Sequence, residues 1–241
     1  MTNITDPATY EAWYHTPRGR WIGDREFILL QSLLRTPKGG SLLDVGCGTG
    51  HFSRRFSRSG LSVTGIDPVP AVLKFARTQG DDIHYMQGNA LELPFADNSF
   101  DYTVAVTSLC SIEDPLLALR EMWRVTRHTL VLGLLNRHSL LHWRKQGQGG
   151  YSGARWDTAG EVLKEWIPVF TPAPKKIVVR SAIFLPQGTR IAQWSEQWLH
   201  GALPWGGFLA VGLRKELLLV SNNCAQKWQR SSYPSKSMAL T

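Results

Sequence analysis

Short apolar runs alternate with amphipathic segments along most of this chain. Runs rich in Leu, Val and Ile predict strands that are buried on both faces of a sheet. Strands are expected over residues 41–45, 62–66, 83–87, 101–106, 129–135, 176–183 and 208–213. Segments whose apolar residues lie three or four positions apart predict helices. Helices are expected over 22–34, 50–59 and 69–78, after Asp114, and from Ala159 toward Trp166.

Residues at the ends of these segments support the assignment. Asp114 followed by Pro115 is typical of a helix start, with Asp as the N-cap and Pro in the first turn. Thr158 and Glu161 have the spacing of a capping box. Stretches rich in Gly or Pro are expected to form loops; they cover 36–40, 147–153 and 168–174.

The order of these elements predicts the fold class. Strands that alternate with helices form a doubly wound α/β sheet, here of Rossmann-like type, with helices on both faces. Such sheets bind ligands beyond the carboxyl ends of their strands, where the strand order reverses. A ligand site is therefore expected at that edge.

Composition limits the number of domains and the cell compartment. A chain of 241 residues with 43% hydrophobic content is long enough for one sizeable core. No apolar run approaches the ~20 residues that span a bilayer, and the first residues do not resemble a signal peptide. Cys47, Cys110 and Cys224 lack metal-binding spacing, so we expect reduced thiols, no bound metal and a cytoplasmic protein.

The charge is positive and unevenly distributed. The net charge is +8. Residues 122–156 contain no Asp or Glu but six Arg and Lys residues, and residues 221–241 also lack acids. A basic field attracts anionic partners, so an anionic small substrate and RNA are both open, beside the simpler interpretation of a solvated basic face.

One segment, Leu42-Leu43-Asp44-Val45-Gly46-Cys47-Gly48-Thr49-Gly50, joins an apolar strand to a glycine-rich turn that opens a helix. Glycines at alternate positions let bare main chain approach a ligand. The dinucleotide pattern G-x-G-x-x-G is not met, because His51 stands where its last Gly belongs. A Walker loop is excluded too, since no Gly-Lys-Ser/Thr follows.

This segment resembles motif I of the class I S-adenosylmethionine-dependent methyltransferases, in particular the small group that includes ubiquinone and menaquinone biosynthesis enzymes. The resemblance continues in order through Gly65-Ile66-Asp67, Gln87–Phe95, Ser99-Phe100-Asp101 and Glu121–Val125. It implies a seven-stranded, mostly parallel sheet with the last strand antiparallel, and S-adenosylmethionine as cofactor. It also implies an N-terminal helical lid over 1–40 and a cofactor-binding domain over 41–220. Residues 221–241 show no clear period and are expected to form a flexible basic tail.

The family implies a set of cofactor contacts. The turn would lie under the methionine part, Asp67 would bind the ribose hydroxyls, and Asn89 would contact the adenine. The full set of expected cofactor residues is Asp44, Gly46, Cys47, Gly48, Gly50, Asp67, Asn89, Ala90, Leu91 and Thr107.

Residues on the acceptor side are predicted from their position in the lid or just beyond a strand. They are Tyr14, Arg18, Arg20, Trp21, Cys110, Asn136 and His138. His138 is a candidate general base and Tyr14 a second candidate catalytic residue. Cys110 is expected to be a small buried filler rather than a nucleophile, because nothing nearby would lower its pKa.

The expected function is methyl transfer from S-adenosylmethionine to a small anionic or aromatic acceptor. Two alternatives stay open: an RNA-modifying methyltransferase, and a cofactor-binding interaction protein without turnover. The missing third glycine disfavours an NAD-dependent oxidoreductase. Neither the acceptor atom nor the oligomeric state follows from the sequence.

Overall fold

The structure, a computed structural model, describes residues 6–34, 39–198 and 203–215. The predicted tail over 221–241 lies outside these residues. The elements are α1 (Pro7–His15), α2 (Pro17–Leu34), β1 (Ser41–Val45), α3 (His51–Arg58), β2 (Ser62–Asp67), α4 (Pro70–Thr78), β3 (His84–Gln87), β4 (Phe100–Val106), η1 (Leu109–Ser111), α5 (Pro115–Val125), β5 (Thr126–Leu135), α6 (Leu140–Lys145), η2 (Gly149–Tyr151), α7 (Ala159–Glu161), η3 (Val162–Trp166), η4 (Ile167–Val169), β6 (Lys176–Ala182), α8 (Arg190–Trp198) and β7 (Phe208–Arg214).

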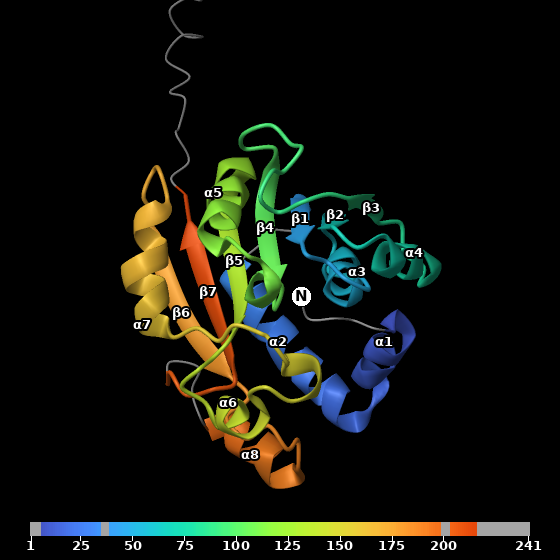
Figure 1. Ribbon diagram of the computed structural model, residues 1–241, viewed down its shortest axis with the longest axis vertical. Helices are drawn as coiled ribbons and strands as arrows, with labels where there is room; N and C mark the ends of the chain where they lie inside the picture. The colour runs from blue at the N-terminus through green and yellow to red at the C-terminus, as the bar shows by residue number, and fades with distance from the viewer. Residues whose placement is uncertain (1–5, 35–38, 199–202, 216–241) are drawn as a thin grey trace, which may run out of the picture.

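The strands form one seven-stranded sheet in the order β3-β2-β1-β4-β5-β7-β6. The pairs from β3 to β5 are parallel, and β7 runs antiparallel to both β5 and β6. The predicted mostly parallel sheet with an antiparallel last strand is confirmed. The order reverses between β1 and β4, and Figure 1 shows α1 and the start of α2 at the end of the sheet toward which β4 points.

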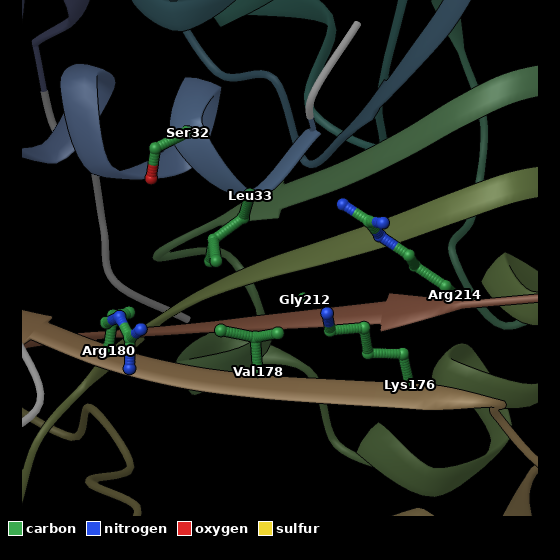
Figure 2. A pocket seen from close by; sticks show the side chains of 7 residues that line it. All are labelled: Ser32, Leu33, Lys176, Val178, Arg180, Gly212 and Arg214. Carbon is green, nitrogen blue, oxygen red and sulfur yellow. The ribbon is translucent and has the colours of Figure 1, made fainter.

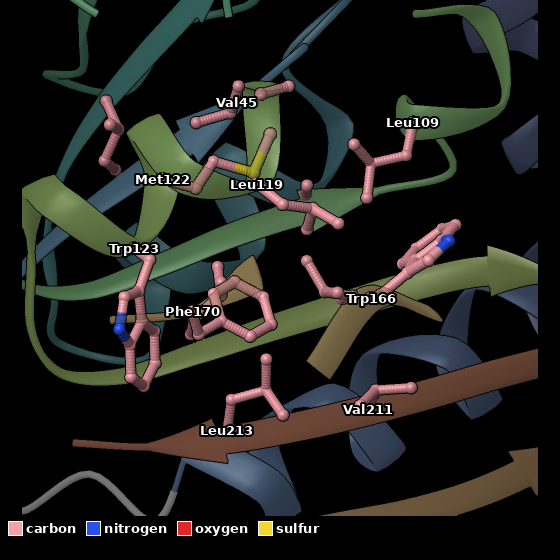
Figure 3. Close-up of a cluster of buried hydrophobic side chains, with 14 of the residues drawn as sticks. Val45, Leu109, Leu119, Met122, Trp123, Trp166, Phe170, Val211 and Leu213 are labelled. Carbon is pink, nitrogen blue, oxygen red and sulfur yellow. The ribbon is translucent and has the colours of Figure 1, made fainter. Parts of the chain in front are cut away.

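Alternate residues of each strand enter two separate cores, because successive side chains of a strand point to opposite faces. Leu43 and Ala105 pack with α5 and η3 on one face, whereas Leu42 and Val104 pack with α2 and α3 on the other. Figure 3 shows Met122, Trp123 and other members of the first core over β7. The helices on both faces confirm the predicted doubly wound arrangement.

The predicted helix starts are present. The Asp114 carboxylate accepts from the Leu117 N–H at 3.0 Å, and the capping box of Thr158 and Glu161 has both hydrogen bonds. One start was wrong: α2 begins at Pro17 rather than at Ile22. Thr16 Oγ1 accepts from the Gly19 N–H at 3.0 Å, and Pro is favoured in a first turn; the pair Thr16-Pro17 was the signal.

Two helices were missed, α6 and α8. Ser139 caps α6 by accepting from the His142 N–H at 3.1 Å. Both helices are short, so they show too few periods for an apolar pattern to be recognised. No helix among the described residues is long and apolar enough to cross a membrane.

We expect Leu119→Ala to lower the free energy of unfolding by roughly 2–5 kcal/mol, because it leaves a cavity in a close-packed core. Leu119 is fully buried in the α5 core. Urea unfolding of Leu163→Ala provides the matched control: Leu163 is 45% exposed, so its loss should stay within about 0.5 kcal/mol. Similar losses in both variants would contradict the packing described.

Candidate functional site

The turn between β1 and α3 has room for bare backbone only. Gly46 has φ +72°, and a Cβ there would lie 2.3 Å from the Ser108 Cβ beyond β4. Gly50 has φ +79°, and a Cβ there would lie 2.2 Å from the Tyr85 hydroxyl. L residues rarely adopt these φ angles. The turn therefore packs closely against Ser108 and Tyr85 at the point where the strand order reverses.

Asp44 lies buried at the end of β1. Its Oδ2 accepts from Ser53 Oγ at 2.6 Å. Burial raises the pKa of Asp44 to about 7, against the opposing effect of the Ser53 hydrogen bond. Such a carboxylate lacks a positive partner among the described residues, and a ligand ammonium would supply one.

Asp67 ends β2, the strand paired with β1, and its charge contributes to the raised pKa of Asp44. Its Oδ2 accepts from the Gly48 N–H at 3.0 Å and its Oδ1 from the Val69 N–H at 2.9 Å. Burial raises the pKa of Asp67, although both hydrogen bonds oppose the rise. Each carboxylate oxygen keeps acceptor capacity, so the group can still accept from two neighbouring hydroxyls.

The turn over 89–91 follows β3, and Asn89 shapes it. The Asn89 Oδ1 accepts from the Leu91 N–H at 3.0 Å, so the amide Nδ2 is free to donate. Arg124 and Glu121 hold the following residues: Glu121 accepts from the Leu93 N–H at 2.9 Å, and Arg124 Nη2 donates to the Leu93 carbonyl at 3.0 Å. The matching motif Glu121–Val125 therefore positions this turn from α5.

Beyond β4 the backbone turns sharply at Thr107, a non-glycine residue with φ +49°. Such positions are uncommon and concentrate at functional sites. Its carbonyl accepts from Cys110 Sγ at 3.0 Å. Burial raises the pKa of Cys110, which agrees with the prediction of a buried thiol rather than a nucleophile.

A buried ion pair fixes α1 to the glycine turn. Glu11 pairs with Arg54 of α3 and accepts from Thr49 Oγ1 at 2.6 Å, and all three are buried. Burial alone would raise the pKa of Glu11, but hydrogen bonds from His51 and Thr49 and the charge of Arg54 lower it to about 2. The ionised pair thus joins the N-terminal helix to the β1–α3 turn.

Tyr14 of α1 stacks on His51 at the start of α3, with ring centroids 3.6 Å apart and planes 11° apart. Burial lowers the pKa of His51, and its Nε2 is buried without a partner among the described residues. The Tyr14 hydroxyl lies 3.4 Å from that of Tyr10. An aromatic wall therefore stands beside the glycine turn.

The matches with known proteins agree with this geometry. A family model described as "Methyltransferase domain" matches residues 43–131. An uncharacterized protein of Mycobacterium tuberculosis is 30% identical over 221 residues, which is 86% of this chain and 71% of that protein. The demethylmenaquinone methyltransferase of Renibacterium salmoninarum is 40% identical over 89 residues, or 37% of this chain and 38% of the enzyme. This chain belongs to the class I S-adenosylmethionine-dependent methyltransferases.

The fold comparison covers almost the whole methyltransferase. A S-adenosylmethionine-dependent methyltransferase of Thermotoga maritima, described as a possible histamine N-methyltransferase, superposes with a TM-score of 0.68 at 23% identity. The match covers 89% of this chain and 97% of that one. At this identity the likeness concerns the fold.

The structure separates the residues predicted for the acceptor side. Trp21 is buried near Gly188, and Arg18 Nε donates to the Pro186 carbonyl at 2.7 Å. Arg20 is exposed, with its guanidinium 3.5 Å from the His15 carbonyl. Arg18 and Arg20 therefore engage backbone carbonyls. Glu11 and Tyr14 are the α1 residues that contact the glycine turn and the start of α3.

Asn136 and His138 end β5. The Asn136 amide donates to the carbonyls of Pro204 and Gly206, both at 2.7 Å, and accepts from the His138 N–H at 3.1 Å. Asn136 thus holds the chain that enters β7, and His138 is exposed. These contacts give no further support to the prediction that Asn136 and His138 bind the substrate.

Sequence reasoning missed Glu11, His51 and Glu26. His51 was noted only because it replaces a glycine. Glu26 lies four residues after Ile22 and four before Leu30, and all three are buried. An acid on the apolar stripe of an amphipathic helix violates the hydrophobic pattern, and that violation was the available signal.

A basic hollow lies on the outer strands of the sheet. It has a volume of about 190 Å³ and is lined by Ser32, Leu33, Lys176, Val178, Arg180, Gly212 and Arg214. Figure 2 shows these side chains between α2 and strands β6 and β7. The hollow is therefore distinct from the switch point between β1 and β4.

We expect Glu11→Gln to lower the free energy of unfolding by roughly 3–5 kcal/mol, because it leaves the charge of buried Arg54 uncompensated. The matched control is Asp24→Asn, which breaks the Arg55 pair at a position 48% exposed; this should cost less than about 1 kcal/mol. The contribution of Glu11 is complete above its ordinary pKa of 4.5 and is lost as pH falls toward about 2. Equal losses in thermal or urea unfolding would show that the pair does not anchor α1.

Proposed function

We propose that this methyltransferase transfers the methyl group of S-adenosylmethionine to a small-molecule acceptor. The observation that carries the proposal is the docking of α1. The Glu11–Arg54 pair and the Tyr14–His51 stack hold the helix beside the glycine turn. A site bounded by a docked helix suits a small acceptor better than a polymer, and it excludes water from the reacting atoms.

The cofactor contacts are proposed on the donor chemistry of the site. Asp44 would face the ammonium of the methionine part, Asp67 the ribose hydroxyls, and Asn89 the adenine through its amide Nδ2. Gly46 and Gly50 would shape the turn beneath the ligand, since their missing side chains leave room for Ser108 and Tyr85. Cys47, Gly48, Ala90, Leu91 and Thr107 would complete the cradle through their backbone.

The bound cofactor supplies an activated methyl group on a sulfonium, so the chain has only to bind and orient both partners. Orientation of reacting atoms can supply roughly 7–11 kcal/mol of a barrier. The absence of an obvious acid–base dyad from the sequence is compatible with this role. The name of the Renibacterium salmoninarum relative, a demethylmenaquinone methyltransferase, supports a small acceptor.

The charge argument for an RNA-modifying methyltransferase is weaker in the folded protein. It rested on the six cations of the acid-free stretch over 122–156. Four of them pair with acids: Arg124 with Asp97 and Glu121, Arg127 with Asp101, Arg137 with Glu161, and Arg155 with Asp157. The charge available to a phosphate backbone is therefore smaller than the sequence indicates.

Cofactor binding can be tested by thermal unfolding. S-adenosylmethionine should raise the melting temperature of the wild type, since a ligand that binds the folded state stabilises it. Asp67→Ala should abolish this shift, because the ribose hydroxyls lose their acceptor. The control Asp82→Ala changes an exposed acid and should keep it. An unchanged shift in Asp67→Ala would remove Asp67 from the site, and no shift in folded wild type would refute the cofactor proposal.

The affinity for S-adenosylmethionine should depend on pH. The ammonium binds ionised Asp44, whose pKa is raised to about 7 by burial. The dissociation constant for S-adenosylmethionine should therefore rise as pH falls below 7, approaching roughly tenfold per pH unit. Isothermal titration at pH 5.5, 6.5 and 7.5 measures this slope, and Asp44→Asn should flatten it. The same slope in the variant would assign the titration to another group.

A further inference from the structure

One buried acid of α2 takes no part in the proposed cofactor contacts. Glu26 of α2 is 9% exposed, and no hydrogen bond or ion pair reaches it from the described residues. Arg55, the nearest charge that opposes its burial, pairs instead with Asp24 at 2.7 Å and lies over the Phe27 ring at 4.5 Å. A buried acid without a partner is costly, so its retention requires an explanation.

The position of Glu26 joins it to the lid. One turn before it on α2, a Cβ at Gly23 would lie 3.1 Å from the Tyr14 ring and 3.4 Å from His51 Nε2. Residues three positions apart share a helix face. Glu26 therefore continues the face of α2 that lies against Tyr14 and the start of α3.

Three tyrosines lie within electrostatic range of this carboxyl group. Burial raises the pKa of Tyr10, Tyr14 and Tyr151, and the negative charge of Glu26 adds to the rise at all three. Tyr10 and Tyr14 come from α1 and Tyr151 from η2, so the charge of Glu26 acts on elements that are distant in sequence.

The same cluster reaches the end of β4. The Cys110 thiol also acts on the pKa of Tyr10 and Tyr151, and Cys110 Sγ donates to the Thr107 carbonyl at 3.0 Å. Thr107 is among the proposed cofactor contacts. Tyr10 and Tyr151 therefore lie within electrostatic range of the thiol that follows Thr107 at the end of β4.

We propose that Glu26 binds the ammonium group of a cationic methyl acceptor and that the neighbouring tyrosines wall this site. A carboxylate supplies the charge that a buried ammonium requires, and tyrosine faces attract organic cations. The inference rests on the proposed function and narrows its substrate class: an acceptor with an anionic group at this point would be repelled.

Binding of the cation has a proton signature. Burial raises the pKa of Glu26 to about 8, with Arg55 opposing the rise, so the free site holds a protonated carboxyl at pH 7. The ammonium favours the ionised form, and the carboxyl proton is released to solvent. Tyr10, Tyr14 and Tyr151 keep their protons, since their pKa values are raised.

The test uses the full chain saturated with S-adenosylhomocysteine and three probes of similar size: 2-phenylethylamine, 2-phenylethanol and 3-phenylpropanoate. Isothermal titration at pH 7 should show at least tenfold tighter binding of the amine than of the alcohol and no binding of the carboxylate. Titration in two buffers of different ionisation enthalpy should show release of close to one proton per amine.

Glu26→Gln should remove the preference for the amine and the proton release while S-adenosylhomocysteine still binds. The matched control Glu165→Gln changes an exposed acid on the opposite face of the sheet and should behave as wild type. Absence of amine binding, or equal binding to Glu26→Gln, overturns the inference alone. Weaker binding of S-adenosylmethionine to Glu26→Gln, with unchanged binding of S-adenosylhomocysteine, overturns it as well. Glu26 would then face the sulfonium. Failure of the product itself to bind the wild type would refute the proposed function instead.

Discussion

The close approach of three chain segments at the end of β1 governs the rest of this site. The turn over 46–50 passes so near Ser108 and Tyr85 that side chains at Gly46 and Gly50 would overlap them. Because the turn is bare, the ends of β1, β2 and β4 can approach one another, and the charge of Asp67 acts on the pKa of Asp44. A larger residue would separate the strands and the two carboxylates together.

Three of the buried acids, Glu11, Asp44 and Glu26, have different electrostatic situations. Glu11 is paired with Arg54 and hydrogen-bonded, so its pKa falls to about 2 and it stays ionised. Asp44 and Glu26 have no cation beside them, and burial raises their pKa values to about 7 and about 8. The paired acid stabilises the fold, whereas an acid that lacks a partner is stabilised when a ligand brings positive charge. In the proposed reaction, Asp44 would face the ammonium of the cofactor and Glu26 that of the acceptor.

Part of this architecture could be predicted from the sequence. The seven strands, their order of appearance and the helix caps at Asp114 and Thr158 follow from local pattern, because alternation and capping depend on neighbours along the chain. The ordered motifs from Leu43 to Val125 identified the family. The start of α2 and the short helices α6 and α8 were missed, since short elements carry too little periodicity.

Contacts between distant segments were decided by the tertiary structure alone. The basic stretch over 122–156 contains no acid, yet Asp97, Asp101, Asp157 and Glu161 neutralise four of its cations. Asn136, expected at the acceptor, holds the backbone before β7, and Glu26, placed among apolar positions of a helix, joins tyrosines from α1 and η2. The sequence determined the fold class and the cofactor motif because both depend on local spacing. Only the tertiary structure decided which charges are paired, because burial and pairing depend on residues brought together by folding.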